Sequence, residues 1–209
     1  MAIERGQQWG SQLVVPVDLV QASSDVELAE YIARGKKNIA VTDGDMWRTI
    51  GAGAQVVAAG EMAMCLPIDV MKVDYQIDGI ATTKLAVAHV VTRESNFRGG
   101  WLRGEVSVIA NAQFLDRWDV APRGHPNDGR VELTHVDPAM GVRQRVSARS
   151  RLRTGTHVPH PLIKTKSVKS FDRDFAQKSG QILWIDQRRI GRVQKLSIEV
   201  MSDEAFLWM

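Results

Sequence analysis

The 209-residue sequence has little cysteine, few aromatic residues and no long apolar run. Cys65 is its single cysteine, which excludes an internal disulfide and a Cys-x-x-Cys zinc site, so a reducing, cytoplasmic setting is expected. No run approaches the roughly 18 apolar residues of a membrane span, and the first ten residues lack the apolar segment of a signal peptide. These features predict a soluble globular protein, with Cys65 in its core.

Acidic residues are missing from one long stretch, although the net charge is only +3. Between Ala139 and Phe171 there is no Asp or Glu, while the basic residues are Arg143, Arg145, Arg149, Arg151, Arg153, Lys164, Lys166 and Lys169. Such a block indicates an anionic partner: a phospholipid headgroup with peripheral membrane contact, a nucleotide phosphate or nucleic acid. A solvated basic face is an equal alternative.

A small α/β unit is predicted for residues 1–60. Residues 12–21 read as a strand edged by Pro16. A helix follows, with Ser24 and Glu27 as a capping box and Gly35 beyond its end. The segment KNIAVTDGDMWRTIG then predicts a strand, a turn and a short helix. The unit is βαβ-like, and is too short to form a doubly wound sheet alone.

The remaining residues, 61–209, predict strands and turns. Apolar residues alternate from residue 67 to 94 around an Asp78-Gly79 turn, and the pattern is expected to continue through GGWLRGEVSVIANAQFLDRWDV and DGRVELTHVD. The fold class predicted is α+β, an antiparallel β-sandwich domain preceded by the α/β unit, with a boundary between residues 52 and 66.

The arginine-rich segment VRQRVSARSRLRTG allows two interpretations. A helix would place Arg145, Arg149 and Arg153 on one face, whereas a strand would place arginines at odd positions. The helix is the favoured prediction.

The order of several motifs resembles that of bacterial diacylglycerol and lipid kinases. From about residue 39 to 200, these motifs are VTDGDMWRTIG, LPIDVMKV, NAQF, APRGHPNDGRVEL, GTHVPHPLIKTKSV and LWIDQRRIGRVQKLSIEV. The resemblance implies that residues 105–200 form the family's β-sandwich domain, which carries a lipid groove. It also implies ATP and Mg²⁺ as cofactors.

A rigid turn, HPNDG, corresponds to the family's metal-binding turn. The resemblance places Asp128 on the metal-binding carboxylate and the backbone carbonyls of His125 and Arg130 on the flanking positions. Such oxygen donors suit Mg²⁺ or Ca²⁺. Arg123 would raise the local potential for an anion. In the alternative interpretation, Asp128 only bonds the backbone of its own turn.

The nucleotide loop of the family, Gly-Gly-Asp-Gly-Thr, lets bare backbone N–H groups approach phosphate. This chain has Asp43, Gly44 and Asp45 there, which makes them candidate phosphate ligands. Their carboxylates would repel ATP unless a metal intervened. The family's Gly-Thr-Gly-Asn-Asp segment is also missing, so most of the nucleotide-binding half is absent.

The family's late Asp-Gly-Glu motif supplies carboxylates near the attacking hydroxyl. Here it reads Asp186-Gln187-Arg188, which makes Asp186 the candidate catalytic carboxylate. Arg188 cannot act as a general base. Four basic residues are further candidate ligands for a phosphate: Arg145, Arg149, Arg153 and His157.

Two minor alternatives concern other chemistry. His157 and His160 could belong to a transition-metal site, but no third ligand lies nearby in sequence. Trp101, between Arg98 and Arg103, could stack on single-stranded nucleic acid, although a half-buried strand residue is the more common role.

Two functions are compatible with these residues. In the first, the chain is a diverged lipid-kinase-like protein that binds an anionic lipid or phosphorylated ligand without catalysing transfer by itself. The alternative is an ATP- and Mg²⁺-dependent lipid kinase that completes its nucleotide site with another subunit. The missing glycines and Arg188 favour the first; Asp43, Asp128 and Asp186 support the second. Exposed sheet edges predict self-association.

Overall fold

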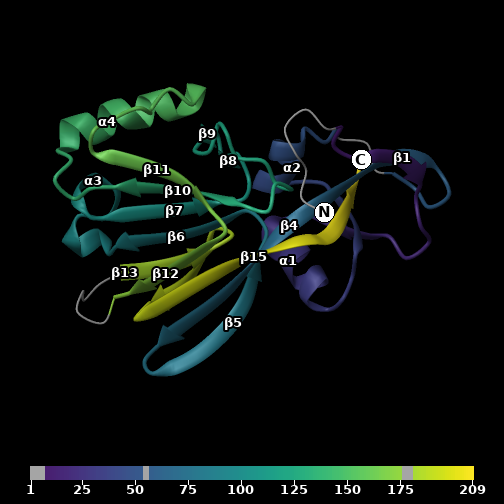
Figure 1. Cartoon of the computed structure of the whole chain (residues 1–209), viewed down its shortest axis with the longest axis horizontal. Helices are drawn as coiled ribbons and strands as arrows, with labels where there is room; N and C mark the ends of the chain where they lie inside the picture. The colour runs from purple at the N-terminus through teal and green to yellow at the C-terminus, as the bar shows by residue number, and fades with distance from the viewer. Residues whose placement is uncertain (1–7, 54–56, 176–180) are drawn as a thin grey trace.

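Two large sheets form the body of the molecule (Figure 1), described for residues 8–53, 57–175 and 181–209 in a computed structural model. The first sheet contains β1 (Ser11–Val14), β2 (Val20–Ala22), β3 (Asn38–Val41), β4 (Met62–Ile77), β5 (Ile80–Ala86), β12 (Ser170–Asp174) and β15 (Lys195–Trp208). The second contains β6 (His89–Glu94), β7 (Val106–Ala110), β10 (Val131–Val136), β11 (Ile163–Val168), β13 (Gln181–Ile185) and β14 (Arg188–Arg192). A separate ribbon pairs β8 (Phe114–Leu115) with β9 (Trp118–Asp119).

The helices lie around these sheets. They are α1 (Asp25–Ala33), α2 (Asp45–Ile50), α3 (Gly100–Arg103) and α4 (Val142–Arg151), with 3-10 turns η1 (Asn96–Arg98) and η2 (Leu152–Thr154). The mixture of sandwich and helices confirms the predicted α+β class. Within the described ranges, no helix is both long and apolar enough to cross a bilayer.

The last strand joins the N-terminal unit to the sandwich. β15 runs antiparallel to β4 along most of its length, and its final residues pair in parallel with β3. β2 and β3 are also parallel, as expected for strands connected through the helix α1. The predicted βαβ-like unit is therefore present. β15 pairs with β3, which precedes residue 60, and with β4, which follows it. The predicted division into two domains at residue 60 stays a prediction.

The sandwich core lies between the two sheets. Alternate residues of β4 and β15, such as Val73 and Ile198, are fully buried against Ile109 and Leu183 from the second sheet. A second core, which includes Leu28, packs beneath α1. The period-two alternation read from the sequence therefore places one face of each strand inside. Cys65 is buried, as predicted.

The helix α1 begins and ends close to the predicted signals. The Ser24 hydroxyl accepts a hydrogen bond from the Glu27 N–H at 3.2 Å. The Glu27 carboxylate accepts from the Ser23 N–H at 2.8 Å, one residue before the position that a capping box would use. Gly35 follows the helix with φ +80°, a conformation that favours glycine.

The predicted strand through GGWLRG is wrong. Gly99 and Gly100 have φ values of +104° and +47°, and the chain forms η1 and α3 before β7 starts at Val106. The two glycines permit this reversal, which apolar alternation alone does not reveal. The helix favoured for the arginine-rich segment is confirmed as α4.

Candidate functional site

A pocket of about 520 Å³ lies at the starts of α1 and α2, beside the turn between β13 and β14. It brings together four candidate residues that are distant in sequence: Asp43, Gly44, Asp45 and Asp186. Its other charged lining residues are Asp25, Arg48, Asp116 and Arg188. Five aspartates against two arginines make this an acidic pocket.

The backbone N–H groups at the start of α2 are already occupied. The buried Asp25 carboxylate accepts from the Asp45 N–H at 2.7 Å and from the Met46 N–H at 3.0 Å. Asp43 Oδ1 accepts a hydrogen bond from the Gly44 N–H at 2.7 Å. Asp25 therefore stands where the phosphate of a ligand would bind in a glycine-rich loop, so this turn does not fit a nucleotide phosphate.

Gly44 is required by this arrangement. Its φ is +116°, and a Cβ atom at this position would lie 2.7 Å from Asp25 Oδ1. Gly44 was expected to let a phosphate approach the backbone. Its missing side chain instead allows the Asp25 carboxylate to approach. Burial raises the pKa of Asp25, and the neighbouring Asp45 charge adds to the rise, whereas the two N–H bonds oppose it.

Asp45 connects several segments within the acidic pocket. Its carboxylate accepts from the Gln187 amide at 2.7 Å and from the Asp116 N–H at 2.6 Å. His89 Nδ1 lies 3.5 Å from Asp45 Oδ2. Burial opposes ionisation of Asp45, but the contacts with His89, Gln187 and Asp116 outweigh it and lower the pKa. Asp45 thus acts as a junction between α2 and two hairpins.

Asp186, the candidate catalytic carboxylate, is buried. Its Oδ atoms accept the N–H groups of Val87, Ala88 and His89, each at 2.9 Å. Burial and the nearby Asp25 charge raise its pKa to about 7. Asp186 and Gln187 have φ of +44° and +65°, as in tight two-residue hairpin loops. The carboxylate therefore holds the connection between β5 and β6 in place. Proton abstraction by Asp186 stays a prediction.

Arg188 lines the same pocket as Asp186 and pairs with α1. Its side chain is 61% exposed, and its guanidinium lies 3.8 Å from Glu30 on α1. Within the described ranges, no group of three or more His, Cys, Asp or Glu side chains is arranged to hold a metal ion.

The HPNDG turn is held by Asp69, a fully buried residue of β4 that the sequence-based hypothesis missed. Asp69 Oδ2 accepts the Gly129 N–H at 2.6 Å, and Oδ1 accepts from the Asn127 amide at 3.3 Å. Burial raises the pKa of Asp69 to about 6, and the nearby Asp128 charge contributes to the rise. The sequence signal that could have identified Asp69 is a single Asp between two apolar residues, Ile68 and Val70, both of which are buried.

Asp128 bonds the backbone of its own turn. Its Oδ1 accepts the Arg130 N–H at 3.0 Å, and burial raises its pKa. The Arg130 guanidinium donates to Ser167 at 2.9 Å, while His125 Nδ1 accepts the Asn127 N–H at 3.1 Å. Asp128 thus makes the hydrogen bond within its own turn that the alternative interpretation expects. Metal binding by its carboxylate and by the carbonyl oxygens of His125 and Arg130 stays a prediction.

An apolar cavity of about 380 Å³ lies between α4 and the second sheet; we call it the α4 cavity. Its walls include Val106, Val108, Val120, Val136, Leu152 and Ile163. The volume falls within the range of small-molecule sites. The sequence did not reveal this cavity, because its walls come from strands and helices far apart in the chain.

His157 is a buried wall residue of the α4 cavity. It is 4% exposed, and neither ring nitrogen has a hydrogen-bond partner within the described ranges. Burial lowers its pKa, while the nearby Asp119 charge opposes this effect, so His157 is neutral near pH 7. Buried polar atoms without partners are rare in folded proteins, and they require an explanation such as a ligand or water.

The predicted arginine ligands differ in their availability. The buried Arg145 guanidinium donates to the carbonyl oxygens of Met140, Trp101 and Asp137 at 2.9–3.0 Å, so its donors are largely used. Arg149 is exposed, lines the cavity and lies 4.8 Å from the ring centre of Trp118. Two other candidates are exposed and do not line the cavity: Arg123 and Arg153.

The β8–β9 hairpin separates the two sites. Asp116, in its turn, lines the acidic pocket and donates its N–H to Asp45. Leu115 and Trp118 line the α4 cavity. The acidic pocket and the apolar cavity are therefore neighbours on the two sides of one short ribbon.

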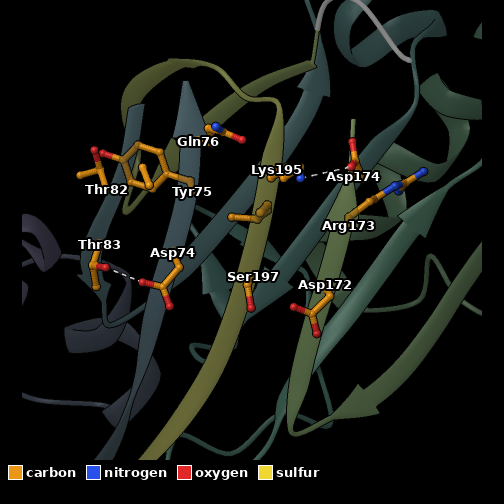
Figure 2. Close-up of a pocket in the computed structure, with 12 residues that line it drawn as sticks. Asp74, Tyr75, Gln76, Thr82, Thr83, Asp172, Arg173, Asp174, Lys195 and Ser197 are labelled. Atoms are coloured by element: carbon orange, nitrogen blue, oxygen red, sulfur yellow. Dashed lines mark hydrogen bonds and ion pairs between the residues drawn. The ribbon is translucent and has the colours of Figure 1, made fainter. Parts of the chain in front are cut away.

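A third hollow, of about 640 Å³, crosses the face of the first sheet (Figure 2). Its side chains pair with one another: Thr83 donates to Asp74, and Lys195 lies 3.9 Å from Asp174. None of the candidate residues lines it, so we place the functional site elsewhere.

Solved structures of proteins from Bacillus anthracis str. Sterne share this fold. One, described as a diacylglycerol kinase, has a TM-score of 0.53 and 13% identity, covering 90% of this chain and 76% of that chain. A second, described as "a putative diacylglycerol kinase", has a TM-score of 0.52 and 11% identity, covering 91% of this chain and 77% of that chain. No protein-family model and no curated protein matches the chain. The resemblance inferred from the motif order is confirmed for the fold.

Replacing Asp25 tests whether it holds the start of α2. We expect Asp25→Ala to lower the free energy of unfolding by about 1–3 kcal/mol, because two buried N–H groups lose their acceptor. Urea denaturation measures the change. Glu30→Ala, on the exposed side of the same helix, is the control and should cost less than about 1 kcal/mol. Equal losses in the two variants would contradict this role.

The raised pKa of Asp69 predicts a pH dependence of stability. Between pH 4 and 6 the unfolded chain releases this proton, whereas the folded protein retains it, so stability falls as the pH rises. Each unit of pKa difference corresponds to about 1.4 kcal/mol. Asp69→Asn should flatten this slope in denaturation measured at several pH values. Asp74→Asn, a partly exposed control on the same strand, should keep the slope; an unchanged slope in Asp69→Asn would refute the assignment.

Proposed function

We propose that this chain, with the fold of proteins described as diacylglycerol kinases, binds an anionic lipid or similar phosphorylated amphiphile in the α4 cavity. We further propose that it does not transfer a phosphoryl group by itself. The observation that carries the proposal is the α4 cavity, whose apolar walls enclose the unpartnered His157.

The two parts of an amphiphile match different parts of this cavity. An acyl chain would gain from contact with the valine and leucine side chains of the walls, because it leaves water. A neutral His157 can donate one hydrogen bond to an ester or phosphate oxygen. The exposed guanidinium of Arg149 supplies positive charge at the same wall.

The absence of autonomous transfer is supported by the acidic pocket. Asp25 and Asp43 occupy the backbone N–H groups that a nucleotide phosphate would need. The Asp186 carboxylate is engaged by three N–H groups, and Arg188 stands where a second carboxylate would be. These hydrogen bonds support a structural role for the carboxylates in place of proton abstraction from a hydroxyl.

One observation favours the alternative, an ATP- and Mg²⁺-dependent lipid kinase acting as an oligomer. Asp43, Asp45 and Asp186 converge on one pocket that neighbours the α4 cavity through the β8–β9 hairpin. Bound Mg²⁺ would supply positive charge among these carboxylates and offset their repulsion of ATP. A transfer assay with ATP, Mg²⁺ and diacylglycerol decides between the two functions: phosphorylated product made by the purified chain would establish the alternative.

Ligand-dependent thermal unfolding tests the proposed function. We expect short-chain phosphatidate to stabilise the protein, by about 2.7 kcal/mol at 100 times its dissociation constant. ATP, with or without Mg²⁺, should have no such effect. Stabilisation by Mg²⁺-ATP alone would contradict the proposal and support the kinase.

A cavity-filling variant links the stabilisation to the α4 cavity. Ala148 lines the cavity, whereas the adjacent Ser147 is exposed on the same helix. We expect Ala148→Phe to abolish the shift caused by phosphatidate, because its ring takes the space of the acyl chain. Ser147→Phe should retain the full shift. An equal response of both folded variants would place the ligand outside the cavity.

His157→Leu removes the hydrogen-bonding group while keeping an apolar wall. We expect weaker binding of phosphatidate, by about tenfold for the loss of one hydrogen bond of roughly 1.4 kcal/mol. The free protein should be no less stable, because the ring nitrogens have no partner to lose. Titration of the thermal shift against ligand concentration gives both quantities, with His160→Leu as the control.

A further inference from the structure

We infer that the surface formed by η1, α3 and α4 docks on an anionic lipid bilayer. This inference rests on the proposed function, since it names the source from which the α4 cavity takes its lipid. We call this surface the docking face and define it by four exposed apolar residues: Phe97, Trp101, Leu102 and Val146.

Four large apolar side chains are exposed on the docking face. Phe97 is 102% exposed, while Trp101, Leu102 and Val146 are 43%, 48% and 55% exposed. Single exposed apolar residues are common, but a group that includes a fully exposed aromatic ring indicates an interaction surface. Tryptophan suits the boundary between lipid headgroups and acyl chains, because its ring is amphipathic.

The four side chains belong to one continuous part of the structure. Trp101, Leu102 and Val146 all line the α4 cavity, and η1, which carries Phe97, runs directly into α3. Arg145 connects the two helices, since its guanidinium donates to the Trp101 carbonyl oxygen at 3.0 Å. Figure 1 shows α3 and α4 together at one end of the molecule. The docking face therefore includes wall residues of the cavity.

The charge around the docking face selects an anionic bilayer as its partner. Five arginines of α3, α4 and the adjoining residues are exposed: Arg103, Arg143, Arg149, Arg151 and Arg153. The chain from Ala139 to Phe171 contains no acidic residue to offset them. Exposed rings that can enter the headgroup region, beside cations that attract anionic lipid, form the usual combination of a peripheral membrane site. A purely apolar protein partner would not require this excess of arginine.

Co-sedimentation with vesicles tests the inference. We expect the full chain to pellet with phosphatidylcholine vesicles containing 30% phosphatidylglycerol, and at least fivefold less with phosphatidylcholine alone. The variant Phe97→Glu, which changes a residue of the docking face outside the cavity lining, should reduce binding to the anionic vesicles at least fivefold. High salt should weaken binding of the wild-type protein, because it screens the arginines.

The control is Ile80→Glu, an exposed apolar residue at the β4–β5 hairpin, which Figure 1 places at the edge of the molecule away from α4. This variant should bind vesicles like the wild-type protein. Equal loss in Ile80→Glu and Phe97→Glu would overturn the docking face. So would full binding by Phe97→Glu.

Short-chain phosphatidate separates this inference from the proposed function. We expect Phe97→Glu to retain the thermal shift caused by the soluble lipid, because Phe97 lies outside the lining of the α4 cavity, and the shift also shows that the variant is folded. A wild-type protein that responds to soluble phosphatidate but ignores vesicles would overturn the docking face alone and would favour a protein partner for that surface. A protein that responds to neither would overturn both proposals.

Discussion

Buried carboxylates that accept backbone N–H groups are the interaction on which the rest of the structure depends. Asp25 holds the start of α2, Asp186 holds the connection between β5 and β6, and Asp69 holds the turn before β10. Each carboxylate joins segments at least 20 residues apart. Their burial is costly, and it is offset by two or more hydrogen bonds to each group. Connections that would otherwise be loose loops are thereby attached to the sheets.

This use of carboxylates limits the chemistry of the acidic pocket. The N–H groups at the start of α2 already donate to Asp25, and both oxygens of the Asp186 carboxylate accept backbone N–H groups. The fold is that of proteins described as diacylglycerol kinases, and at this pocket the carboxylates of Asp25 and Asp186 accept hydrogen bonds from the chain's own backbone. Aspartate carboxylates, which could otherwise bind a ligand, here hold loops in place.

The α4 cavity differs because one of its polar groups, the buried His157 ring, lacks a partner among the described residues. His157 is buried among apolar walls without the hydrogen bonds that accompany Asp25 or Asp186. The β8–β9 hairpin keeps the two environments apart, with Asp116 on the acidic side and Trp118 on the apolar side. Arginines concentrate at the apolar side, and we propose that lipid enters there from a bilayer beneath Phe97 and Trp101.

The sequence by itself determined the elements with local signals. Ser24 and Gly35 mark the ends of α1, Asp78-Gly79 marks a hairpin, and alternation marks the sandwich, since these signals depend on neighbouring residues. Motif order also indicated the shared fold. Only the tertiary structure decided that Asp25 meets α2, that Asp69 meets Gly129 and that distant residues enclose a cavity beside His157. Such contacts join residues far apart in the chain, so hydrophobic periodicity and turn propensity carry no information about them.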